Sequence, residues 1–94
     1  MPRPPQIPDG MRRSSHTIAA TATQIFPFSN DRVEAIIQNT GANPVFLGED
    51  NGVTTGNGWP LAAGAVLVLN TSDAIWGIVA AATETLRILE TYDK

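Results

Sequence analysis

Few residues in this 94-residue sequence have the type and spacing that chemistry requires. A serine triad needs a histidine base beside its nucleophile. His16 follows Ser14 and Ser15, but it borders a proline-rich segment, so we interpret it as a surface residue. It is also the only histidine, and there is no cysteine. A cysteine-rich or mixed Cys/His zinc site is therefore excluded.

The acidic pair Glu49 and Asp50 is the next candidate. Glycosidase-type catalysis needs two carboxylates across a cleft, whereas adjacent residues of a strand point to opposite sides. Together with Asn51 the pair could bind calcium, but "EDNG" lacks the alternating acidic positions of an EF-hand loop. We interpret both acids as solvated turn residues. The sequence thus predicts no catalytic residue, no metal ligand and no cofactor.

The glycine-rich stretch "GVTTGNG", residues 52–58, has no Lys-Ser/Thr after it and no helix to hold phosphate. Its three glycines instead allow positive φ, so they let the chain turn sharply. Asn57–Gly58 is a hairpin-type signal. Trp59 follows the loop, which makes it a candidate exposed anchor or, with the acidic pair, a platform for stacking a sugar.

The elements that must position these residues are predicted to be strands. Turn signals recur roughly every 8–14 residues, and the intervening segments are rich in Val, Ile and Thr. This spacing predicts an all-β fold, a compact antiparallel, jelly-roll-like β-sandwich of six to eight short strands over residues 15–94. A short C-terminal helix over residues 82–94 is the alternative for the end of the chain. Arg32 and Arg87, in predicted strands, are expected to pair with acids such as Glu34 or Glu84.

Residues 1–14 are predicted to form an extended arm outside the sandwich. Prolines at positions 2, 4, 5 and 8 favour polyproline II over helix or central strand. The arm is either a leader without a role or a segment that docks on a neighbouring subunit. Its candidate contacts are Ile7, Met11, Arg12 and Arg13. Nucleic-acid binding is not expected, because the arginines have no aromatic neighbours.

Two predicted strands are apolar on both faces. In "AVLVL", residues 65–69, Val66 and Val68 face one way and Leu67 and Leu69 the other, and "AIWGIV", residues 74–79, behaves alike. A sheet with one wet face should alternate apolar and polar residues. Only 16% of the residues are charged, so we expect a second chain to cover part of the surface. The expected interface residues in the sandwich are Trp59, Leu67, Leu69, Trp76 and Ile78.

Neither a secretory signal nor a membrane span is expected, since no apolar run has the required length. Three phrases carry a resemblance instead: "RVEAIIQNTGANPVFLGEDNGVTTGNGWPLAAG", "AVLVLNTSDAIWGIVA" and "TLRILE". This layout resembles small virion proteins of tailed bacteriophages, which include head decoration (cement) proteins and head-fibre or connector components. The resemblance covers about residues 32–90 and includes no catalytic motif.

The resemblance implies a non-enzymatic virion structural protein. As a decoration protein it would be made in the host cytoplasm, bind the major capsid protein on the outer surface of the head, and self-associate, commonly as a trimer. The alternatives are a head–tail connector, tail or fibre-base component of the virion, or a carbohydrate-binding module that uses Trp59. An enzyme is the reading with least support, because no constellation of polar groups supplies a catalytic site.

Overall fold

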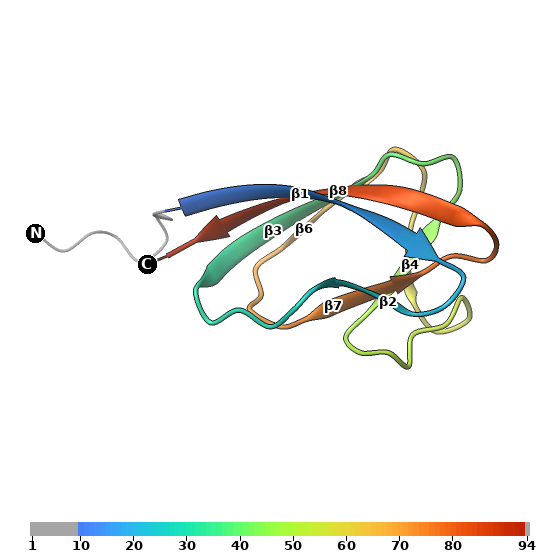
Figure 1. Cartoon of the computed structure of the whole chain (residues 1–94), viewed down its shortest axis with the longest axis horizontal. Helices are drawn as coiled ribbons and strands as arrows, with labels where there is room; N and C mark the ends of the chain where they lie inside the picture. The colour runs from blue at the N-terminus through green and yellow to red at the C-terminus, as the bar shows by residue number, and fades with distance from the viewer. Residues whose placement is uncertain (1–9, 94) are drawn as a thin grey trace, which may run out of the picture.

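The computed structural model describes residues 10–93, which form eight strands in two antiparallel sheets (Figure 1). Sheet A has the order β1 (Gly10–Ala19), β8 (Thr83–Tyr92), β3 (Arg32–Asn39) and β6 (Val66–Leu69). Sheet B has the order β2 (Thr23–Phe26), β7 (Ile75–Ile78), β4 (Val45–Gly48) and β5 (Trp59–Leu61).

The strands pair as one long folded hairpin. β1 pairs with β8, β2 with β7, β3 with β6 and β4 with β5. Two further pairings, β3 with β8 and β4 with β7, complete the two sheets. This nested order is that of an eight-stranded jelly roll. The predicted all-β sandwich of six to eight strands is therefore confirmed.

The C-terminal segment is a strand and not the alternative helix. Side chains along β8 alternate between buried and more exposed positions over most of its length, which is the period of a strand. Leu86 and Ile88 point into the core, whereas Arg87 and Leu89 point outward. β8 pairs with β1 on one side and β3 on the other. The N–H and C=O groups of its backbone therefore find hydrogen-bond partners in the sheet, and no helix is needed to pair them.

The core lies between the two sheets. Its fully buried large apolar side chains, at less than 2% exposure, come from both sheets: Ile18, Ile25, Ile37, Val45, Val79 and Leu86. Gly77 of β7 leaves room for them, since a Cβ there would lie 3.1 Å from Ile25 Cδ1 and 3.3 Å from Val45 Cγ1. Absence of a side chain in the middle of sheet B thus lets the layers approach closely.

Asn39, at the end of β3, joins the two sheets by hydrogen bonds. Its side chain is fully buried, and its Nδ2 donates to the carbonyl oxygens of Asn43 at 2.8 Å and Leu61 at 2.9 Å. Its Oδ1 accepts from Gly41 N at 2.9 Å. Every polar atom of this amide side chain is therefore used to hold the loops at one end of the sandwich.

The β4–β5 loop, residues 49–58, is held by its own contacts. Val53 is buried, Asn57 Oδ1 accepts from Thr54 N at 2.7 Å, and Gly58 N donates to Thr54 O at 2.9 Å. None of the three glycines in the loop has a positive φ, so the loop does not use the left-handed conformation that glycine allows. Gly58 is needed for space instead, because a Cβ there would lie 2.8 Å from Phe46 Cβ.

β1 begins at Gly10, which pairs with Tyr92, so residues 10–14 belong to sheet A. The strand therefore starts five residues before the boundary expected at residue 15. The predicted contact Ile7 lies outside the described residues. In Figure 1 the paired ends of β1 and β8 extend beyond sheet B at one end of the sandwich.

Candidate functional site

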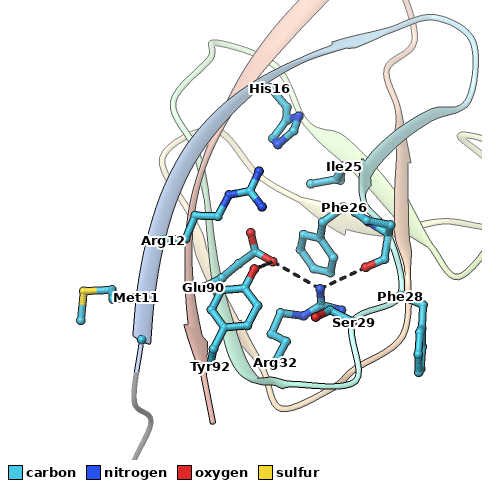
Figure 2. A pocket seen from close by; sticks show the side chains of 12 residues that line it. Met11, Arg12, His16, Ile25, Phe26, Phe28, Ser29, Arg32, Glu90 and Tyr92 are labelled. Carbon is cyan, nitrogen blue, oxygen red and sulfur yellow. Dashed lines mark hydrogen bonds and ion pairs between the residues drawn. The ribbon is translucent and has the colours of Figure 1, made fainter. Parts of the chain in front are cut away.

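A groove of about 480 Å³ opens at this extended end, between β1 and β8 on one side and the segment from β2 to β3 on the other (Figure 2). It exists because β1 and β8 run on past sheet B, so the inner face of sheet A is left uncovered there. The lining residues are Gly10, Met11, Arg12, His16, Ile25, Phe26, Pro27, Phe28, Ser29, Arg32, Glu90 and Tyr92.

Arg32 forms the fixed base of the groove. Its side chain is 1% exposed, and Nη1 lies 3.2 Å from Glu90 Oε2, which is 4% exposed as a side chain. Nη1 also donates to Pro27 O and Nε to Thr71 O, both at 3.1 Å, while Nη2 donates to Asp73 O. One guanidinium therefore fastens β3 and β8 to the loops on either side.

The same guanidinium lies 4.1 Å from the centroid of the Phe26 ring, a cation–π contact across the two sheets. Arg32 does pair with an acid, as expected, but the acid is Glu90 and not one of the two examples, Glu34 and Glu84. Glu84 instead accepts from Ala42 N at 3.0 Å and Asn43 Nδ2 at 2.8 Å. The reason is topological, because β8 places Glu90 beside the start of β3.

Tyr92 completes the polar floor by donating its hydroxyl to Glu90 Oε2 at 2.9 Å. Burial, and then the hydrogen bond and negative charge of Glu90, raise the pKa of Tyr92 above 10.0, and Arg12 acts in the opposite direction. Figure 2 shows Arg12 and His16 on β1 pointing into the groove. Arg32 and Tyr92 both bond Oε2 of Glu90, so this carboxylate is held in place as part of the groove wall.

A second hollow, of about 340 Å³, lies at the opposite edge of the sandwich, between β6 and β5. It is lined by Leu47, Gly48, Trp59, Leu67, Leu69 and Ile75. Trp59 is 65% exposed, as expected for an anchor. The lining has no polar side chain, whereas a sugar site needs hydrogen-bonding groups beside the stacking ring. Glu49 and Asp50 are exposed, and Asp50 Oδ1 accepts from Gly52 N at 2.9 Å as in a turn.

The outer face of sheet A carries a continuous apolar row. Leu89, Ile36 and Val68 stand opposite one another across β8, β3 and β6, and Arg13 of β1 continues the row. Val68 is 50% exposed and Val66, further along β6, is 55% exposed. On sheet B a similar row consists of Ile78, Phe46 and Pro60, with Trp76 beside it.

The strand β6 is also a sheet edge with unused backbone groups. Asn39 N donates to Ala65 O at 3.0 Å, so the antiparallel alternation assigns the hydrogen-bonded pairs to Ile37–Leu67 and Ala35–Leu69. The N–H and C=O groups of Val66 and Val68 then point away from β3. In the described part of the chain β6 is the last strand on that side of sheet A.

The predicted interface residues thus fall in different places. Trp76 and Ile78 are half-buried on the outer face of sheet B, and Arg13 is exposed on the outer face of sheet A. Leu67 and Leu69 face inward and pack against the core, so the outward residues of β6 are the two valines. Met11 is 70% exposed, and Met11 and Arg12 line the groove. The interface itself stays a prediction.

Sequence reasoning missed Phe28 and Tyr92, which shape the groove, although both are large residues next to predicted turns or chain ends. Among residues 10–93, no cluster of three or more His, Asp or Glu residues could hold a metal ion. The described chain likewise contains no helix of the length and apolarity needed to cross a bilayer.

Comparison with known proteins identifies a similar fold. A solved chain from Bacillus endospore appendages, described as a novel family of disulfide-linked pili, superposes with a TM-score of 0.54 at 22% sequence identity. The match covers 90% of this chain and 87% of that chain. No protein-family model matches the sequence, and neither does any curated protein. At this identity the similarity concerns the fold alone.

Proposed function

We propose that this protein is a non-enzymatic structural subunit that joins copies of itself through the β6 edge of sheet A. The observation that carries the proposal is β6 itself. It is a short edge strand with no charge and no proline, its outward side chains are half-exposed valines, and the backbone groups of those valines face away from the sheet. Such an edge is a template for pairing with another strand.

The other short edges of the molecule are protected. β5 contains Pro60, which has no N–H to donate, and β2 has a register irregularity between Gln24 and Phe26 and is followed by Pro27. Both features are ways of preventing strand addition. Because β6 has neither, a strand of another copy would pair there and cover Val66 and Val68 at the same time.

We favour a role as a decoration protein, which binds the major capsid protein on the outer surface of a tailed-phage head and assembles there with other copies of itself. Support comes from the sequence resemblance to small phage virion proteins and from the jelly-roll fold, which viral capsid proteins also use. Each subunit would add apolar contact and strand pairing, so that many weak contacts together stabilise the shell. Copy number separates this role from a connector, because decoration requires hundreds of copies per particle.

The solved chain of similar fold comes from appendages described as pili, so in that protein the fold serves a polymeric structure. Its disulfide linkage cannot be transferred, since these 94 residues contain no cysteine. Strand pairing and apolar contact would have to hold the copies of this chain together.

The test is the mass of the purified protein in solution, measured by light scattering after size exclusion. The unchanged chain is expected to self-associate, and Val68→Lys is expected to give the 10.0 kDa monomer, because a lysine on an edge strand opposes pairing. Thr55→Lys, at an exposed position in the β4–β5 loop and away from both edges of sheet A, is the matched control for added charge. A native chain that stays monomeric at high concentration would contradict the proposal.

A further inference from the structure

The groove at the extended end of the sandwich presents more apolar surface than its buried ion pair needs. Two aromatic side chains offer surface there, Phe28 and the half-buried Tyr92, together with Pro27, whereas Phe26 is buried against the Arg32 guanidinium. Phe28 is 61% exposed, whereas the side chain of Met11 points away from the groove in Figure 2. Figure 2 shows Phe28 at the rim on one side and Arg12 on the opposite wall. Aromatic walls with a few polar groups are typical of grooves that bind proline-rich peptides.

The chain itself contains such a peptide. Residues 1–9, which lie outside the described part, read "MPRPPQIPD". Polyproline II has three residues per turn, so it would sort this sequence onto three edges. Met1, Pro4 and Ile7 share one edge, Pro2, Pro5 and Pro8 the second, and Arg3, Gln6 and Asp9 the third. Two adjacent edges are therefore apolar and one is polar.

We propose that the groove binds residues 1–9 of a second copy as a polyproline II helix. The two apolar edges would pack on Pro27, Phe28 and Tyr92, and the polar edge would face solvent. Proline rings stack well on aromatic faces, and a segment that is already stiff loses little conformational entropy on binding. The inference rests on the proposed self-association, which keeps a second copy close enough to raise the effective concentration of the segment.

A second copy suits this groove better than the same chain. Gly10 lines the groove and starts β1, so the chain's own residues 1–9 would have to reverse direction at once to lie along it. Pro8 restricts Ile7 to extended conformations, and a reversal takes at least about two turn residues. A segment from a neighbour needs no reversal, and nine residues in polyproline II reach about 28 Å.

The test is a titration that separates the groove from self-association. The receiver is the full-length, ¹⁵N-labelled chain with Val68→Lys to prevent pairing at β6 and with Pro2, Pro5 and Pro8 changed to Ser to weaken its own arm. The probe is a synthetic peptide of residues 1–9. We expect saturable shifts of the amide signals of Phe28, Ser29 and Tyr92, while signals of β5 and β6 stay in place.

Three controls make the result specific. Phe28→Ala in the receiver is expected to weaken peptide binding at least about tenfold, through loss of one aromatic wall. Trp59→Ala removes an equally exposed ring at the opposite edge and is expected to leave the affinity unchanged. A peptide with serine at its four proline positions is expected not to bind.

The proposal is overturned if no saturable shift occurs, or if the serine peptide binds as well as the proline peptide. It is also overturned if the unchanged arm occupies the groove of its own chain. In that case a Val68→Lys chain with its prolines intact would show the bound signal positions at every dilution. If Val68→Lys fails to abolish self-association, the role of β6 is wrong, but the peptide titration still reports on the groove.

Discussion

At the scale of single residues, the side chain of Arg32 makes a dense set of buried polar contacts. It meets one carboxylate, three backbone carbonyl groups and an aromatic ring, and all of these lie around a side chain that is 1% exposed. Burial of such a pair is not in itself stabilising, because both charges lose water. Removal of one member is costly, since it leaves the other charge buried and unpaired.

We therefore expect Arg32→Ala to lower the free energy of unfolding by about 3–5 kcal/mol. Arg87→Ala, an exposed arginine on β8, is the matched control and should change it by less than about 0.5 kcal/mol. Replacement of both partners, as Arg32→Met with Glu90→Leu, should recover much of the loss. Urea unfolding at neutral pH measures all three. Equal effects of the two arginine variants would show that the buried cluster has no special role.

A second prediction for a single residue concerns Tyr92 and the pH dependence of the free energy of unfolding. Its pKa is raised above 10.0 in the folded protein, so the folded state holds the proton more tightly than the unfolded state. The resulting stabilisation is complete below pH 10 and is lost as the pH rises through the folded pKa. We expect the unfolding free energy to fall in this alkaline range, and Tyr92→Phe to remove that part of the fall.

Because Tyr92 is the only tyrosine, its ionisation can be followed directly by absorbance. Arg12→Ala is expected to raise the Tyr92 pKa further, since the Arg12 charge and hydrogen bond lower it. Arg13→Ala, on the outer face of sheet A, should leave it unchanged. An Arg12→Ala titration that overlays that of the unchanged chain would show that Arg12 does not interact with Tyr92.

At the scale of the elements, periodicity in the sequence was sufficient to predict strands but not to assign their faces. Val66 and Val68 were correctly placed opposite Leu67 and Leu69, because alternation depends only on the chain. Which pair points inward depends on how β6 pairs with β3, and this register is not visible in a strand that is apolar on both faces. The Arg32–Glu90 pair was missed for the same reason, since its members are 58 residues apart.

Two substitutions at neighbouring positions of β6 test which of its residues face the core and which face outward. Leu67→Asp places a carboxylate against the core and should cost about 2–4 kcal/mol of unfolding free energy. Val68→Asp places the same group in solvent and should cost less than about 1 kcal/mol, while still preventing self-association. Thermal unfolding of the two variants at low protein concentration gives the comparison. Equal losses would mean that both faces of β6 are covered within one chain.

At the scale of the whole molecule, the proposed self-association has two edge strands of sheet A to use among the described residues, β6 and β1. β6 paired with β6 of another copy makes a two-fold symmetric contact, and growth stops at a dimer. β6 paired with the other edge strand, β1, makes a head-to-tail contact that can close into a ring. The trimer expected from the resemblance requires the second kind of contact, because three-fold symmetry joins unlike surfaces.

Cysteine cross-linking distinguishes the two contacts cleanly, since the sequence has no cysteine of its own. We expect Val68→Cys mixed with one of Arg13→Cys, Ser15→Cys or Thr17→Cys to form a covalent dimer of unlike chains under mild oxidation. These β1 positions are exposed and, like Val68, lie on the outer face of sheet A, so one of them should come within disulfide distance. Val68→Cys alone should not cross-link under these conditions. Rapid cross-linking of Val68→Cys to itself, with a solution mass of two chains, would show that β6 pairs with β6 and that the ring does not form.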